Sequence, residues 1–190
     1  RAETGIANAV AHIDGWGYWG YDAMHPDVLP PNVVTIMSNE DNLRQRLPQA
    51  DLVIGAVLLA GARAPVLITR EMLKTMKNGA VIVDVCIDQG GCTEMSKPTT
   101  HADPVYQVEG VVHYCVTNMP GAVGRTSTFA LTNVTLPYAR RLARLGLKRA
   151  VAEDPGIRAG VNMIDGHLTL EPVAGQFGLR HTPVEQALQA

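Results

Sequence analysis

Two polar side chains, Asp88 and Asn118, stand where a sheet protein could do chemistry. Each comes shortly after an apolar run, and Gly90, Gly91 and Gly121 lie close by. A carboxylate there can accept and return a proton, with its pKa shifted by partial burial. An amide both donates and accepts hydrogen bonds, so Asn118 could bind a carboxamide. Spacing alone favours a turn role for Asp88 and leaves ligand binding and loop capping equally open for Asn118.

Other candidate ligands have simpler explanations. Ser38 could bond a ribose or an adenine edge, but its position favours a helix N-cap. His113 lies in an apolar strand, so we interpret it as a core histidine with satisfied hydrogen bonds. The three cysteines could join His101 or His113 at a metal, but they have no zinc-ligand spacing, and we expect no metal site. These cysteines are Cys86, Cys92 and Cys115.

Alternating apolar runs and helix signals predict the parallel sheet that would position these residues. A helix is expected to begin within 38–41 and continue to Leu47, and a second to run from a Thr69 cap to Lys77. Strands that alternate with helices over short loops indicate an α/β fold. Ligands of such sheets bind at the carboxyl ends of the strands. The predicted strands are 33–37, 51–57, 80–85 and 111–116.

The pattern changes after Pro120 and Gly121. The spacing predicts a long helix over 126–145, kinked or ended at Pro137, and a second helix over 147–153. Asp165-Gly166 predicts a hairpin, and 171–177 a short helix. We therefore divide the chain into 1–122 and 123–190. Before the first clear strand, 9–13 could be a short strand, and 15–31 is predicted to be loop.

Composition narrows the class of protein. The 190 residues carry a formal net charge of −2 with 18% charged residues, which gives no basic footprint for nucleic acid. No apolar run approaches the roughly 18 residues needed to cross a bilayer. An odd number of cysteines without paired spacing favours a reducing cytoplasm. The chain has no initiator Met, so we expect it to be a fragment.

Three segments resemble the alanine dehydrogenase family, in this order and at this spacing. They are Asp51-Leu-Val-Ile-Gly-Ala-Val-Leu58, Val81-Ile-Val-Asp-Val-Cys-Ile-Asp-Gln-Gly-Gly91, and Asn118-Met-Pro-Gly-Ala-Val-Gly-Arg-Thr-Ser-Thr-Phe-Ala-Leu-Thr-Asn133. The likeness covers about residues 28 to 188. It implies a partial Rossmann-like, NAD-binding domain at 1–122 that is followed by a helical C-terminal segment of the substrate domain at 123–190.

The resemblance also implies an activity and partners. The family oxidises L-alanine to pyruvate and ammonia while reducing NAD, and its members commonly form homo-hexamers. Hydride leaves the α-carbon of alanine, water adds to the resulting iminium, and a carbinolamine collapses with loss of ammonia. An acid/base group beside the α-carbon must assist these proton transfers.

Site residues carry over from the family by matching motifs. The family's catalytic aspartate falls on Asp88. The implied NAD contacts are Ser38, Val57, Leu58, Val85, Cys86, Ile87, Asp88, Lys97, Val116, Thr117, Asn118 and Met119. Lys97 stands where an Arg is common, so the charge is kept but the planar fork is lost.

Departures from the family pattern leave alternatives open. The strand–turn–helix unit that cradles a pyrophosphate is expected to be missing, and the family's catalytic His matches none of the histidines here. We therefore expect the chain alone to be inactive. The alternatives are a transhydrogenase-type nicotinamide nucleotide-binding domain and a non-catalytic remnant that binds NAD or serves in assembly.

Overall fold

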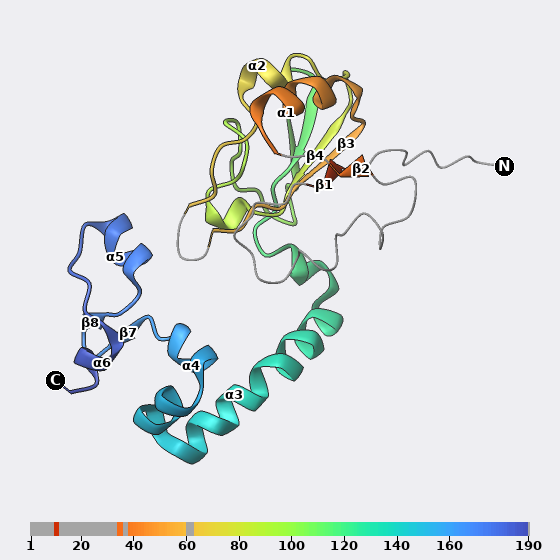
Figure 1. The fold of residues 1–190 in the computed structure, drawn as a ribbon. Coiled ribbons are helices and arrows are strands. Elements are labelled where there is room, and N and C mark those ends of the chain that lie inside the picture. Colours follow the sequence, from red (N-terminus) through yellow and green to blue (C-terminus); the bar gives the residue numbers. More distant parts are fainter. Residues whose placement is uncertain (1–9, 12–33, 36–37, 60–62, 190) are drawn as a thin grey trace. The chain divides into compact units, whose positions relative to one another are not determined.

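The computed structural model describes residues 10–11, 34–35, 38–59 and 63–189 (Figure 1). The described residues form two compact units. The first comprises the described residues up to Ala56 together with Pro65–Ile87 and Gly91–Val116, and the second comprises the described residues within 57–64 together with Asp88–Gly90 and those from Thr117 onward. The loop predicted at 15–31 lies outside the described residues, as does most of the strand predicted at 9–13.

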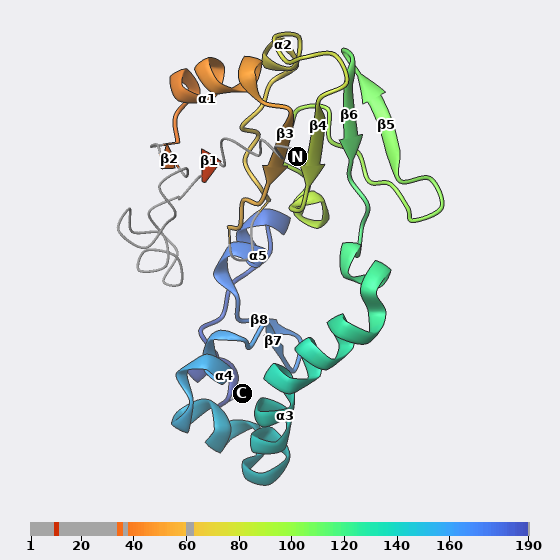
Figure 2. The same cartoon turned by 90° about the vertical axis from the view of Figure 1, so that its right-hand side faces the viewer.

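A four-stranded sheet forms the first unit, in the order β3-β4-β6-β5 (Figure 2). Strands β3 (Leu52–Gly55), β4 (Val81–Asp84) and β6 (Val111–Tyr114) run parallel, as their continuous apolar runs predict. Separately, β1 (Val10–Ala11) and β2 (Val34–Thr35) pair in parallel. The prediction of an α/β fold is confirmed, and the predicted parallel arrangement holds for β3, β4 and β6.

Strand β5 (Val105–Val108) lies antiparallel at one edge of the sheet, and the sequence reasoning missed it. It joins β6 through a two-residue turn at Glu109 and Gly110, both with positive φ, 50° and 80°. Two left-handed residues make the tight hairpin turn that matches the twist of the strands. Such turns are usually recognised by Asn-Gly or Asp-Gly. Glutamate rarely takes this conformation, so Gly110 was the only residue here that indicated a turn.

The two faces of the sheet differ in what covers them. The core of the first unit comprises Leu47, Ile68, Met72, Leu73, Met76, Ala80, Ile82 and Val111. Burial of a side chain the size of Leu73 contributes about 1.5 to 3 kcal/mol. Along β3, Val53 packs against this core, whereas Ile54 points to the other face and is 62% exposed.

Two short helices accompany the sheet. Helix α1 (Glu40–Arg46) continues into the 3-10 turn η1 (Leu47–Gln49). Helix α2 (Arg70–Leu73) begins at its predicted cap, Thr69, but it ends well before Lys77. After Leu73 the backbone hydrogen bonds join residues three apart, as from Met76 N–H to the Leu73 carbonyl, rather than four apart. The hydroxyl of Thr75 also donates to the carbonyl of Met72 at 2.7 Å, and this bond competes with the helical hydrogen bonds.

The second unit is mainly helical. Helix α3 (Gly124–Glu153) continues through Pro137, and its backbone leaves helical geometry at Gly146 (φ 71°, ψ 166°). Of the two alternatives predicted for Pro137, a kink or an end, the end is wrong, while the predicted break between 145 and 147 is confirmed. The carboxylate of Asp154 caps the next helix through the N–H groups of Gly156 and Ile157, and it also pairs with Arg141 at 3.0 Å.

The rest of this unit contains the predicted hairpin and a helix at its predicted bounds. The elements are α4 (Pro155–Ala159), β7 (Met163–Ile164), β8 (His167–Leu168), α5 (Glu171–Phe177) and α6 (Val184–Ala187), of which α4 and α6 were not predicted. Among the described residues, we find no helix with the length and apolar character to cross a membrane.

Replacing Asn39 with Ala tests which residue caps α1. The Oδ1 atom of Asn39 accepts from the Asn42 N–H at 2.8 Å, so this side chain, rather than that of Ser38, satisfies a free helix N–H group. We expect Asn39→Ala to lower the free energy of unfolding by about 1 kcal/mol. Urea unfolding measures the change. Ser38→Ala is the matched control, and an equal loss in that variant would contradict the assignment.

Candidate functional site

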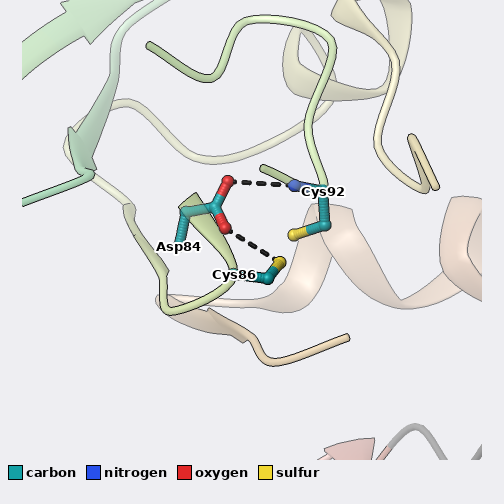
Figure 3. A group of neighbouring side chains, drawn as sticks. All are labelled: Asp84, Cys86 and Cys92. Atoms are coloured by element: carbon teal, nitrogen blue, oxygen red, sulfur yellow. Dashed lines mark hydrogen bonds between the residues drawn. The ribbon is translucent and has the colours of Figure 1, made fainter. Parts of the chain in front are cut away.

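A buried carboxylate organises the carboxyl end of β4. Asp84 is the last residue of the strand and has no exposed surface. Its Oδ2 accepts from the backbone N–H of Cys92 at 3.0 Å and from the hydroxyl of Ser96 at 2.5 Å, while its Oδ1 accepts from the thiol of Cys86 at 3.0 Å. Figure 3 shows both cysteine sulfur atoms directed toward the same small space as this carboxylate. Asp84 therefore ties together both ends of segment 86–92.

Segment 91–99 is held in place by further backbone bonds. The carbonyl of Cys92 accepts from Leu67 N–H at 2.8 Å, and Glu94 N–H donates to the Ile68 carbonyl at 2.9 Å. Farther along, Thr99 N–H donates to the carbonyl of Cys115. The loop that follows β4 is thus connected to the segment that precedes α2 (Arg70–Leu73) and to the residue that follows β6, which restrains the groups that donate to Asp84.

Two glycines make the close packing around Asp84 possible. A Cβ atom at Gly55 would collide with the sulfur of Cys92. Gly91 has a φ of +79°, and a Cβ there would collide with Ser96 and lie 2.7 Å from Asp84 Oδ2. Glycine is therefore required at 91 for both its backbone conformation and its lack of a side chain.

The thiols beside Asp84 are suited to stay protonated. Burial raises the pKa of the Cys92 thiol well above its usual range, and the negative charge of Asp84 adds to this effect. Burial likewise raises the pKa of Cys115, whose sulfur lies 3.4 Å from the Tyr106 hydroxyl. A protonated thiol can donate a hydrogen bond, as Cys86 does to Asp84. In this state the cysteines act as buried donors rather than as nucleophiles.

His113 lies in the sheet with no exposed surface, as a core residue. Its ring stacks on Tyr106 with centroids 5.0 Å apart and an interplanar angle of 9°. Neither ring nitrogen has a hydrogen-bond partner, so the expectation of satisfied hydrogen bonds is wrong. Burial lowers the pKa of His113, and the charge of Asp84 opposes this shift only in part.

Apart from Ser38 and Lys97, the residues predicted to contact NAD follow the ends of three neighbouring parallel strands. The Cα of Gly55 on β3 pairs with that of Asp84 on β4, and Val83 pairs with Tyr114 on β6, so the strands end at one edge of the sheet. The first unit contains Ser38, Val85, Cys86, Ile87, Lys97 and Val116. The second unit contains Val57, Leu58, Asp88, Thr117, Asn118 and Met119.

Asp88 lies in the 3-10 turn η2 (Ile87–Gln89) and is exposed, rather than partly buried as expected. The Ala64 N–H donates to the carbonyl of Gln89 at 2.9 Å, and Gly90 has a φ of +101°. Because β4 ends at Asp84, the chain passes through the buried Cys86 and Ile87 before it reaches the surface at Asp88. The carboxylate is therefore accessible to a ligand from solvent.

Asn118 and Lys97 have clear structural roles beside their predicted ones. Asn118 has left-handed backbone angles (φ 55°, ψ 47°) immediately before the 3-10 turn η3 (Met119–Val123). Asparagine tolerates this conformation better than most residues. The Lys97 N–H donates to the hydroxyl of Tyr106 at 3.0 Å, and its ammonium group lies 4.6 Å from the centre of that ring. Both side chains are exposed.

Sequence reasoning missed Asp84 and Ser96. The available signal was an acidic residue at the end of an apolar strand. A carboxylate buried there needs hydrogen-bond donors, so donors should have been sought in the residues that follow. A second correction concerns the expected absence of a pyrophosphate turn. Residues 15–20 read Gly-Trp-Gly-Tyr-Trp-Gly and do have the spacing of such a turn. The expectation that this glycine spacing is absent is therefore wrong. Because these residues lie outside the described part of the chain, their role in binding a pyrophosphate is untested.

Comparisons with known proteins agree on one family. Residues 22–171 match the family described as alanine dehydrogenase/PNT, C-terminal domain. The chain is 59% identical to an alanine dehydrogenase of Halomonas elongata over 147 residues, which cover 77% of this chain and 40% of that protein. It is 52% identical to an alanine dehydrogenase of Bacillus subtilis over 164 residues, which cover 86% and 43%.

A solved structure supports the same comparison. An L-alanine dehydrogenase aligns with a TM-score of 0.68 at 45% sequence identity, covering 80% of this chain and 42% of that one. The chain thus spans about two fifths of the length of the relatives that it matches.

Gly91→Ala tests the packing around Asp84. The new methyl group would meet Ser96 and Asp84 in a left-handed backbone conformation. We expect the free energy of unfolding to fall by roughly 2 to 4 kcal/mol, from strain and overpacking together. Gly79→Ala is the matched control, because its φ is +85° but no atom lies within 4 Å of the added Cβ. Chemical denaturation that gives equal losses in both variants would refute the packing argument.

His113→Phe tests the buried imidazole. Removal of two unpartnered nitrogens is expected to raise the free energy of unfolding by about 1 kcal/mol at neutral pH. The folded state lowers the pKa of His113, so the unfolded chain binds more protons below about pH 6.5. The unaltered chain should therefore lose stability as the pH falls through this value, and the variant should lose less. Thermal unfolding across this range measures the effect.

The control for this experiment is His167→Gln, since His167 is exposed. That variant should keep the acid sensitivity of the unaltered chain. An acid sensitivity that is unchanged in His113→Phe would show that another group is responsible.

Proposed function

The chain belongs to the alanine dehydrogenase/PNT C-terminal domain family, and on this premise we propose that it is the nucleotide-binding part of an NAD-dependent enzyme that oxidises L-alanine to pyruvate and ammonia. The observation that carries the proposal is the family match over residues 22–171, which includes every predicted contact residue from Ser38 to Met119. Relatives at 52% and 59% identity bear the name alanine dehydrogenase, which favours this activity over a transhydrogenase-type reaction.

The donor chemistry of the strand ends is suited to a nicotinamide nucleotide. The exposed amide of Asn118 can donate to and accept from a carboxamide. Adjacent parallel strands offer backbone groups at one edge of the sheet, where nucleotides bind in folds of this class. NAD, when bound, supplies the acceptor for the hydride from the substrate.

The role proposed for Asp88 is proton transfer. Its carboxylate accepts a proton from the water that adds to the oxidised substrate carbon, and it returns a proton to the departing amine. An exposed carboxylate held on a short turn can serve both steps without a large movement. The Cys86 thiol and the Cys92 N–H, at the two ends of segment 86–92, both donate to Asp84 and restrain the segment that carries this turn.

We also propose that the complete enzyme is a cytoplasmic homo-hexamer, as the resemblance implies. The three cysteines of the chain are free thiols, which suits a reducing compartment. Helix α3 exposes several large apolar side chains, which a partner subunit could cover. These side chains are Phe129, Leu131, Val134 and Leu136.

Calorimetric titration with NADH tests the nucleotide-binding proposal on the chain as it exists. We expect binding in the micromolar range, weakened about tenfold by Asn118→Ala, which corresponds to about 1.4 kcal/mol. Asp103→Asn, an exposed carboxylate outside the strand ends, is the control. Absence of binding up to millimolar NADH would refute the proposal for this chain.

A measurement of the rate of NADH formation tests whether this chain alone catalyses the reaction. Since the chain spans about two fifths of its relatives' length, we expect no alanine-dependent NADH formation from it alone. Absorbance of NADH in the presence of L-alanine and NAD measures the rate. A clear rate that requires alanine would contradict this expectation, and it would assign the whole reaction to the residues of this chain.

A further inference from the structure

Three groups that bind soft metal ions converge at the end of β4. The ligand atoms of Asp84, Cys86 and Cys92 all lie within 4.8 Å of one another. These residues are 0%, 6% and 1% exposed, so the cluster is closed to solvent (Figure 3). The third cysteine, Cys115, is not in this cluster and instead lies beside the Tyr106 hydroxyl.

The two carboxylate oxygens of Asp84 accept hydrogen bonds from different donors. Oδ2 is held by two donors outside the cysteine side chains, the Cys92 N–H and the Ser96 hydroxyl. Oδ1 accepts from the thiol of Cys86 at 3.0 Å. Metal-binding carboxylates are commonly oriented in this way, with one oxygen toward the ion and hydrogen bonds to the other.

We propose that Asp84 Oδ1, Cys86 Sγ and Cys92 Sγ form a binding site for one thiophilic divalent cation of the zinc type. Zinc lies about 2.3 Å from thiolate sulfur and about 2.0 to 2.2 Å from carboxylate oxygen. Donor atoms in a tetrahedral site are therefore about 3.5 to 3.8 Å apart. The three ligand atoms lie within 4.8 Å of one another, and the Cys86 thiol is 3.0 Å from Asp84 Oδ1, so the cluster is close to the spacing that such a site requires.

A divalent ion can bind in this buried cluster without changing the net charge of the cluster. The ion replaces the two thiol protons, which pass to solvent, and no electrons are transferred. The two protons carry away the same charge that the ion brings, so the net charge of the cluster is unchanged. Burial penalises added charge strongly, and this substitution adds none. Asp84 keeps the donors at its Oδ2 throughout.

A bound ion would also connect the two ends of the turn that carries Asp88. Cys86 precedes this turn and Cys92 follows it, and in the ion-free form only hydrogen bonds join them through Asp84. Metal–thiolate bonds would replace the single thiol hydrogen bond. The proposed ligands precede and follow Asp88 in the sequence, but they include neither Asp88 nor any nucleotide contact other than Cys86.

Cobalt(II) titration of the purified chain, in reductant and without oxygen, tests the site. Cobalt replaces zinc in such sites, and its thiolate complexes absorb through sulfur-to-metal charge transfer. We expect one ion per chain with an intensity typical of two thiolates, and displacement of the band by zinc. Cys86→Ser and Cys92→Ser should each weaken binding at least tenfold, and Ser96→Ala should weaken it by about tenfold.

Cys115→Ser is the matched control, since Cys115 is an equally buried thiol outside the cluster, and it should leave the titration unchanged. No charge-transfer band at stoichiometric cobalt would overturn the proposal. An undiminished band in Cys86→Ser or Cys92→Ser would do the same.

If the serine variants do not fold by circular dichroism, cadmium NMR of the unaltered chain decides the question. A chemical shift typical of two sulfur ligands supports the site, and one typical of oxygen and nitrogen alone overturns it. None of these measurements uses NADH or alanine, so their failure is distinct from failure of the proposed enzymatic function.

Discussion

The buried carboxylate of Asp84 is the constraint on which the rest of the first unit depends. An acidic group without exposed surface is costly unless several donors surround it. The chain meets this requirement by turning back after β4, so that Cys92 and Ser96 reach the strand that they follow. This return requires glycine at 91 and leaves no room for a side chain at 55. The path of the turn that carries Asp88 is a consequence of satisfying Asp84.

The parts of the fold that were predictable are those with strong local signals. Continuous apolar runs identified β3, β4 and β6 as buried parallel strands. The Asp165-Gly166 pair identified a hairpin, whereas Glu109-Gly110 adopts a similar turn and gave no recognisable signal. Helix α3 passes through Pro137 and breaks at Gly146, because a glycine can take a positive φ at no steric cost. Its neighbour α4 was missed, although Asp154 and Pro155 form a typical helix start.

Some residues of the candidate site could likewise be predicted from the neighbouring sequence, whereas others depend on contacts between residues that are farther apart in the chain. Asp88 and Asn118 could be found from their sequence positions, because each follows a strong strand and family motifs surround it. The exposure of Asp88 and the left-handed backbone of Asn118 depend on where the preceding strands end. The cluster of Asp84 with Cys86, Cys92 and Ser96 depends on a return of the chain over several residues. No spacing rule for metal ligands describes that return, so sequence reasoning could not assemble the cluster.

The uncovered face of the sheet affects how this chain behaves at high concentration. Leu52 and Ile54 on β3 and Val85 after β4 present apolar surface to water. In the described part of the sheet, β3 is also an edge strand, with one side of its backbone free of sheet neighbours. Apolar surface beside an open strand edge promotes aggregation even when the native core is intact. Association through this surface is thus a constraint on the chain that is separate from the free energy of unfolding.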